Sequence, residues 1–136
     1  MTASADTLRA ILAKANEKLA AAERELAAGF AGEAASRAYY AVFHAIAAVL
    51  ATRGLSFSSH AQIIGAFNRE FVKTGRFPSE STRHLQRLFQ DRQTADYDCI
   101  SVVDVETATR DVADAKTLVA ACVEEIEKHL RSRSSE

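Results

Sequence analysis

The segment 38–51 constrains the fold more than any other part of the chain. It is apolar from end to end, with His44 as its one strongly polar side chain. A helix that is apolar almost all round has to be buried on several sides. The run is shorter than the roughly 20 apolar residues that cross a bilayer. We therefore predict that a helix over about 33–53 lies at the centre of a helical core, and we expect no membrane span.

The remaining apolar residues predict shorter and longer helices around this centre. Their expected ranges are 4–28, 59–75, 80–94 and 102–131. The first and the last carry apolar residues at alternating steps of three and four, which is the spacing of one helix face, so these two are expected to pack side by side. The sequence thus predicts an all-α fold, an up-and-down bundle of four to five helices. One domain is expected over 1–130, followed by a disordered tail over 131–136.

Polar side chains mark the expected helix starts. Ser59, with a glutamine three residues later, has the pattern of a capping box, and Ser79 is expected to cap the next helix. Ser101 and Asp104 form a similar pattern before the last helix. Between the last two helices we expect an irregular stretch over 95–101.

Composition excludes several classes of protein. The 136 residues carry a net charge of −1, so no overall positive field draws the chain to nucleic acid. Cys99 and Cys122 lack the spacing of a metal site or a disulfide framework, and Cys122 falls in a helical apolar stripe, which predicts a buried free thiol. We find no secretory signal, glycine-rich phosphate loop, zinc-ligand pair or serine elbow. A cytoplasmic protein without metal or cofactor is expected.

Helical spacing places Arg37, Tyr40 and His44 on one stripe of the central helix. An arginine on a mostly buried helix needs a partner, because an unpaired buried charge is very costly. The three side chains could bind a phosphate and supply an acid or base. The alternative is a polar seam between packed helices or protomers.

A second group lies in the segment DRQTADYD, where Arg92, Asp96 and Tyr97 are candidates for binding RNA or a nucleotide. If the helix continues this far, Arg92 and Asp96 form an i, i+4 ion pair. The neighbouring acids Asp91 and Asp98 are more typical of a solvated helix end than of a metal site. Six basic residues between 69 and 92 form either a phosphate-binding face or a solvated one. His60, next to a helix start, is expected on the surface.

The block SRAYYAVFHA, followed in order by SSHAQIIGAFNREFVKTG and DRQTADYD, resembles the HEPN domain family over nearly the whole chain. The resemblance implies an all-α bundle that forms a homodimer. It also implies pairing with a minimal nucleotidyltransferase in a toxin–antitoxin-like system. Many HEPN domains are metal-independent ribonucleases, in which an Arg followed after four to six residues by a His holds the phosphate and assists proton transfer.

This chain departs from that Arg-x4-6-His motif. No histidine follows Arg92 within six residues, whereas Arg37 and His44, and also Arg53 and His60, have six residues between them. One hypothesis is a binding or regulatory module for RNA or nucleotide with a degenerate motif. The second is a ribonuclease toxin with a rearranged site, for which His44, Arg37 and Arg92 are the catalytic candidates. The third is a non-catalytic scaffold subunit.

Overall fold

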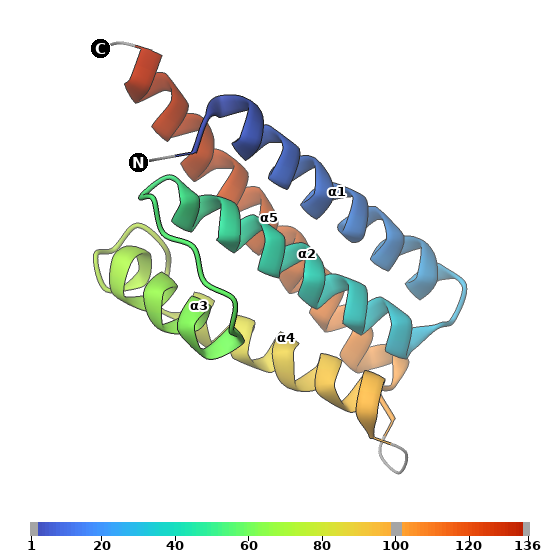
Figure 1. The fold of residues 1–136 in the computed structure, drawn as a ribbon. Helices are drawn as coiled ribbons and strands as arrows, with labels where there is room; N and C mark the ends of the chain where they lie inside the picture. The colour runs from blue at the N-terminus through green and yellow to red at the C-terminus, as the bar shows by residue number, and fades with distance from the viewer. Residues whose placement is uncertain (1–2, 99–101, 135–136) are drawn as a thin grey trace.

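The computed structural model describes residues 3–98 and 102–134, and their regular structure is helical throughout (Figure 1). The elements are α1 (Ala5–Ala27), α2 (Ala31–Ala51), α3 (His60–Phe67), the π-helical turn η1 (Asn68–Val72), α4 (Glu80–Tyr97) and α5 (Val105–Ser134). The predicted all-α bundle is confirmed. In it, α2 packs against α1, α4 and α5, and also touches α3.

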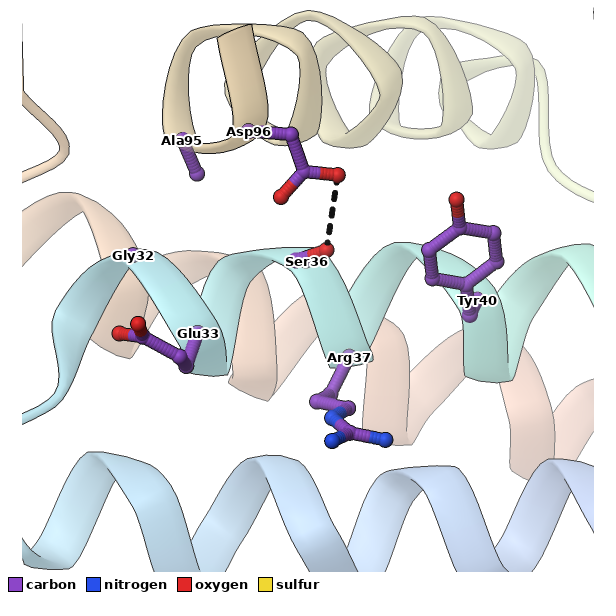
Figure 2. A pocket seen from close by; sticks show the side chains of 7 residues that line it. All are labelled: Gly32, Glu33, Ser36, Arg37, Tyr40, Ala95 and Asp96. Carbon is purple, nitrogen blue, oxygen red and sulfur yellow. Dashed lines mark hydrogen bonds between the residues drawn. The ribbon is translucent and has the colours of Figure 1, made fainter.

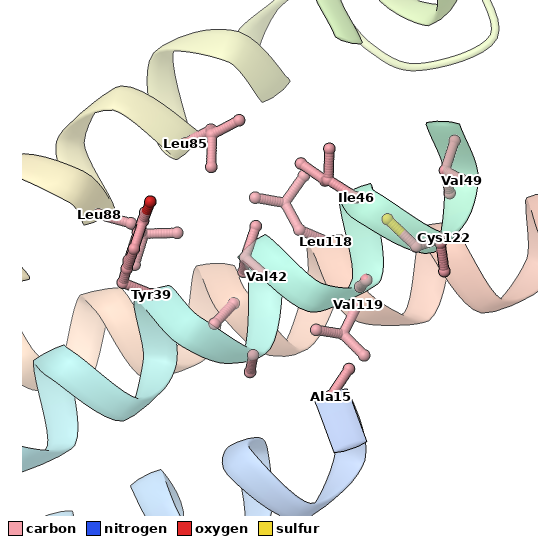
Figure 3. Packing of buried hydrophobic residues seen from close by; sticks show 14 of the residues in the cluster. Ala15, Tyr39, Val42, Ile46, Val49, Leu85, Leu88, Leu118, Val119 and Cys122 are labelled. Atoms are coloured by element: carbon pink, nitrogen blue, oxygen red, sulfur yellow. The ribbon is translucent and has the colours of Figure 1, made fainter. Parts of the chain in front are cut away.

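The centre of the core is α2, as predicted from its apolar run. Val42, Ile46 and Val49 have no exposed surface and lie among side chains of α4 and α5 (Figure 3). Among the described helices, α2 alone has the length and mean hydropathy, 1.3, of a membrane span, and 61% of that window is buried inside the bundle. Phe43 is only partly buried and packs against the edge of this core.

The two long outer helices, α1 and α5, contact each other through their apolar seams, as expected. Leu8 and Ala15 of α1 are fully buried, and so are Ala115 and Cys122 of α5. The buried free thiol is therefore confirmed, and burial raises the pKa of Cys122. Cys99 lies outside the described residues.

The predicted Ser59 cap is present, whereas the last helix is capped by Asp104, which was expected to lie inside the first turn. The Ser59 hydroxyl accepts a hydrogen bond from the Gln62 amide at 3.2 Å, and the Asp104 carboxylate accepts one from the Thr107 amide at 2.7 Å. Ser101 lies outside the described residues. The Ser79 prediction was wrong: its backbone is already helical and its side chain makes no capping bond, because its hydroxyl turns toward Glu80 at 3.3 Å.

Several helix ends differ from the sequence prediction. The helix expected over 59–75 divides into α3 and η1, where the Lys73 amide bonds to the Asn68 carbonyl at 2.8 Å. The helix α4 continues to Tyr97, so the stretch expected to be irregular begins three residues late. The last helix starts at Val105 and extends to Ser134, through most of the tail expected to be disordered. Its final turns are held because Leu130 is buried and Arg133 donates to the Ala3 carbonyl at 2.8 Å.

Candidate functional site

The centre of the site is Arg92, whose guanidinium lies among three tyrosine rings. Its Cζ is 5.8 Å from the Tyr39 ring centroid, 5.1 Å from Tyr40 and 5.2 Å from Tyr97. One Nη donates to the Tyr40 hydroxyl and to the Tyr97 hydroxyl, the second at 3.3 Å. Because α2 supplies two of the rings and α4 the third, the packing of these helices fixes the cation in one place.

Asp96, one turn further along α4, balances this charge. Its carboxylate lies 3.1 Å from Arg92 Nε, which confirms the predicted i, i+4 pair, and it also accepts from the Ser36 hydroxyl at 3.3 Å (Figure 2). The Nε proton is not aligned with the carboxylate, so this buried donor lacks a hydrogen bond. Burial lowers the pKa of Arg92. Tyr40, Tyr97 and Asp96 together raise it by more than burial lowers it, so the net pKa lies above its ordinary value. The positive charge is therefore permanent.

A cleft of about 250 Å³ opens beside this pair, between the first half of α2 and the end of α4 (Figure 2). Its lining residues are Gly32, Glu33, Ser36, Arg37, Tyr40, Ala95 and Asp96. Gly32 lies near Ala95 on the other helix, and a Cβ added at Gly32 would make an ordinary contact with the Ala95 Cβ at 3.7 Å. The cleft thus offers two hydroxyls, the Arg37 guanidinium and two carboxylates, and one of these carboxylates, Asp96, pairs with Arg92.

The predicted stripe of Arg37, Tyr40 and His44 does not act as one group. Arg37 turns to α1, where its Nε is 3.4 Å from the Glu25 carboxylate, whereas Tyr40 turns to α4 (Figure 2). His44 also faces α1: burial lowers its pKa, and Lys14 and Lys18 lower it further. At about 100° per residue, Arg37 and His44 differ by only about 20°, whereas Tyr40 is about 40–60° away from both. That angle separates the α1 side of α2 from the α4 side.

Sequence reasoning missed the histidine that does lie near Arg92. His60, the first residue of α3, is partly buried, and its Nδ1 is 2.9 Å from the Tyr39 hydroxyl. Its ring stacks on Phe89 of α4, with centroids 3.5 Å apart and planes at 15°. The spacing from Arg53 singled out His60, but Arg53 itself lies over the Phe71 ring at 4.6 Å. The contact through Tyr39 joins residues 21 positions apart, which no local motif encodes.

The imidazole of His60 is held in its neutral form. Burial lowers its pKa, and the positive charge of Arg92 lowers it further. Burial raises the pKa of Tyr39 to about 12, so this phenol keeps its proton. With His60 protonated on Nε2, the Tyr39 hydroxyl donates to Nδ1. Tyr39 thereby connects His60 to the ring cluster around Arg92.

Comparison with known proteins places this architecture in a family. The chain matches the HEPN domain over residues 8–126, which include all of the site residues described above. The chain belongs to the HEPN family. A UPF0332 protein of Thermotoga maritima is 48% identical over 64 residues, or 47% of this chain and 48% of that protein. The match thus spans about half the length of the Thermotoga relative.

Two proteins of Methanocaldococcus jannaschii, both named as putative toxins, are also similar to this HEPN chain. One is 32% identical over 101 residues, which cover 74% of this chain and 69% of the relative. The other is 33% identical over 92 residues, which cover 68% of this chain and 69% of the relative.

Elsewhere in this HEPN bundle, a group of acids lies between α4 and α5. Asp111 is fully buried, and its carboxylate accepts a hydrogen bond from Arg87 Nε at 3.3 Å. Arg87 also forms an ion pair with Asp114. Burial and the neighbouring Asp91 carboxyl together raise the pKa of Asp111 to about 8, although Arg87 lowers it in part. The Oδ2 atoms of Asp91 and Asp111 are both buried, and neither has another hydrogen-bond partner. A proton held between Asp91 and Asp111 satisfies both, so our placement of Asp91 at a solvated helix end was wrong.

The six basic residues between 69 and 92 do not form one face. Arg76 pairs with the buried Glu125 at 2.5 Å, and Arg87 is committed to the acids of α5. Arg92 lies in the tyrosine cluster on the α2 side of α4. A continuous phosphate-binding face along this segment is therefore not present, and phosphate recognition has to be sought at individual arginines.

Proposed function

We propose that this HEPN protein is a binding or regulatory module for RNA or a nucleotide in a toxin–antitoxin-like system, and that Arg92 holds a phosphate. The observation that carries this proposal is the fixed guanidinium of Arg92, 17% exposed, whose Nε proton has no aligned acceptor. A phosphate oxygen can accept from the guanidinium edge with better geometry than Asp96 offers, because arginine and phosphate pair through two parallel hydrogen bonds.

The cleft beside Arg92 supports the same assignment. Arg37 at its wall is 45% exposed and can turn from Glu25 toward an anion. Ser36 and Tyr40 add hydroxyl donors at the same edge. Glu33 and Asp96 oppose them, so we expect phosphate to displace Asp96 from Arg92 and to bind with moderate affinity.

We extend the proposal to a homodimer that works with a minimal nucleotidyltransferase partner. The large apolar side chains that remain exposed in the described chain gather at one end of the bundle, at the turn before α2, the end of α4 and the start of α5. They are Phe30, Tyr97, Val102 and Val105, from 56% to 83% exposed. This end borders the cleft, so a second copy docked there would bring two sites together.

Light scattering tests this assembly. We expect twice the monomer mass of 14.8 kDa at micromolar concentration, and the monomer mass after Val102→Asp with Val105→Asp. The double substitution of exposed side chains is not expected to disturb folding. A wild-type protein that runs at the monomer mass refutes the dimer.

Phosphate binding is tested with a fluorescein-labelled single-stranded RNA, by anisotropy. Arg92→Lys keeps the charge but removes the planar fork, so we expect binding at least about tenfold weaker. Arg83→Lys, at an exposed position of the same helix, is the matched control and is expected to bind as wild type. Equal affinities for all three proteins would remove Arg92 from the site.

The second candidate function is a metal-independent ribonuclease, favoured by the position of His60. In its other tautomer, with Nδ1 donating to the Tyr39 hydroxyl, the neutral His60 imidazole has a free Nε2 that can take the proton of a ribose 2′-hydroxyl, and Arg92 would hold the phosphate under attack. In this arrangement α3 supplies the histidine that is missing after Arg92.

Cleavage of total RNA and defined tRNAs, with and without EDTA, decides between the two functions. If the protein cleaves RNA, His60→Gln should lower the rate by about 10²–10⁴-fold, whereas His44→Gln should leave it nearly unchanged. Cleavage that requires His44 and not His60 contradicts this assignment. A wild-type protein that binds RNA without cutting it is the binding module.

A further inference from the structure

A second and larger groove lies between α3 and α4, on the far side of His60 from Tyr39. Its volume is about 550 Å³, and its lining residues are His60, Ala61, Ile64, Gly65, Gln86, Phe89 and Gln90. Apart from His60 the lining carries no ionisable group. The groove therefore suits an uncharged, flat ligand group better than a phosphate or a metal.

The groove contains a preformed stacking surface with amides beside it. His60 and Phe89 stack at 3.5 Å with nearly parallel planes, and the Tyr39 hydroxyl fixes the orientation of the imidazole. Gln86 and Gln90, one turn apart on α4, are both exposed beside this pair. Each amide offers two donors and an acceptor, which is the pattern that pairs with the edge of a heterocyclic base.

Gly65 gives an independent reason to expect an occupant. It lies inside the eight-residue helix α3, where glycine destabilises by about 1 kcal/mol relative to alanine. A Cβ at this position would meet no atom within 4 Å, and the backbone needs no positive φ there. The fold thus does not require glycine at 65, whereas a side chain larger than alanine would enter the groove.

We propose that this groove binds a nucleobase, and that the phosphate of the same nucleotide or strand lies at Arg92. The inference rests on the proposed phosphate site: Arg92 is one turn from Phe89 on α4, and Tyr39 contacts both His60 and the Arg92 cluster. The base would stack on the His60–Phe89 pair, and Gln86 and Gln90 would read its edge. Every base can stack on an aromatic pair, so stacking alone does not distinguish one base from another. Any preference for a particular base would come from Gln86 and Gln90.

The test compares adenosine 5′-monophosphate with ribose 5-phosphate, which has the same sugar and phosphate but no base. Both are titrated into ¹⁵N-labelled protein and followed by NMR. We expect the nucleotide to bind about tenfold more tightly, in line with one base stacked on an aromatic platform. The side-chain amide signals of Gln86 and Gln90 should move with the nucleotide and not with ribose 5-phosphate.

Gly65→Leu fills the groove without a clash in the fold, and circular dichroism checks that the helices are retained. We expect it to remove the tenfold advantage of the nucleotide while ribose 5-phosphate binds as before. Gly65→Ala is the matched control that keeps the advantage. Gln86→Ala with Gln90→Ala, at exposed positions that cannot unfold the bundle, should lower nucleotide affinity severalfold. Competition with a short oligoadenylate tells a free nucleotide from an RNA strand as the source of the base.

The two proposals fail in different ways. Equal binding of both ligands, or a Gly65→Leu protein that binds the nucleotide as wild type, overturns the base groove and leaves the phosphate site in place. If neither ligand binds, the phosphate site is wrong and the base groove fails with it. Both proposals are supported if Arg92→Lys weakens the binding of adenosine 5′-monophosphate and of ribose 5-phosphate, and if Gly65→Leu removes only the tighter binding of the nucleotide.

Discussion

Replacing Asp111 by asparagine should stabilise this protein, and the gain should grow as the pH rises from 5 to 8. The fully buried Asp111 carboxyl has its pKa raised from 3.8 to about 8, so the folded chain holds a proton that the unfolded chain releases. Stability from this group is complete below about pH 4 and is lost as the pH rises toward 8. Asparagine keeps the shape, accepts from Arg87 and donates to Asp91, but has no proton to lose.

The size of the effect follows from this pH interval. Each pK unit corresponds to about 1.4 kcal/mol, so the interval from pH 5 to 8 sets an upper limit of about 4 kcal/mol. This limit already includes the attraction of Arg87, 3.3 Å from Asp111, and relaxation and water penetration around the ionised carboxylate reduce the cost of its charge. We therefore expect the free energy of unfolding of Asp111→Asn, relative to wild type, to increase by about 2 kcal/mol between pH 5 and 8.

Urea unfolding of both proteins at each pH measures this difference. The comparison at equal pH cancels His44 and His60, whose lowered pKa values act in the opposite direction, since the unfolded chain takes up their protons as the pH falls. Asp114→Asn, which removes the other partner of Arg87, is the control and should leave the pH dependence in place. A constant difference between Asp111→Asn and wild type would show that Asp111 is ionised in the folded protein.

Three further predictions concern stability in denaturant titrations. Ile46→Ala should cost about 2–5 kcal/mol because the side chain is fully buried, and Phe43→Ala should cost clearly less; the reverse order would contradict the packing of α2. Asp104→Ala should cost about 1 kcal/mol through loss of the α5 cap, and no loss would mean that another group caps this helix. Gly65→Ala should gain up to about 1 kcal/mol, whereas a loss would reveal a packing reason for glycine.

The helical bundle could be predicted from the sequence because buried helix faces appear as apolar residues at regular spacing along the chain. The apolar run at 38–51 predicted the central helix, and the seams of α1 and α5 predicted their contact. Helix ends were less predictable because tertiary contacts extend them. Residues 95–97 stay helical where Asp96 bonds to Ser36, and 132–134 where Arg133 bonds to Ala3.

The candidate site was only partly predictable, for a different physical reason. Arg92, Asp96 and Tyr97 share one segment, and spacing was enough to group them. Tyr40 meets Arg92 across 52 residues, which depends on the rotation of α2 about its axis rather than on any local pattern. A rotation of about 40–60° along the helix surface separates Tyr40 from Arg37 and His44, and the contact of His60 with Tyr39 joins two different helices.

The hydrogen bond between Arg133 and Ala3 brings the two ends of the described chain together, at the end of the bundle opposite the cleft (Figure 1). From Tyr40 to the end of α2 the helix rises roughly 17 Å, at 1.5 Å per residue. An affinity tag or a domain fused at either end would therefore emerge well away from Arg92. It would reach the cleft only through a linker long enough to pass along the bundle. Either end can thus carry a reporter without obstructing the cleft.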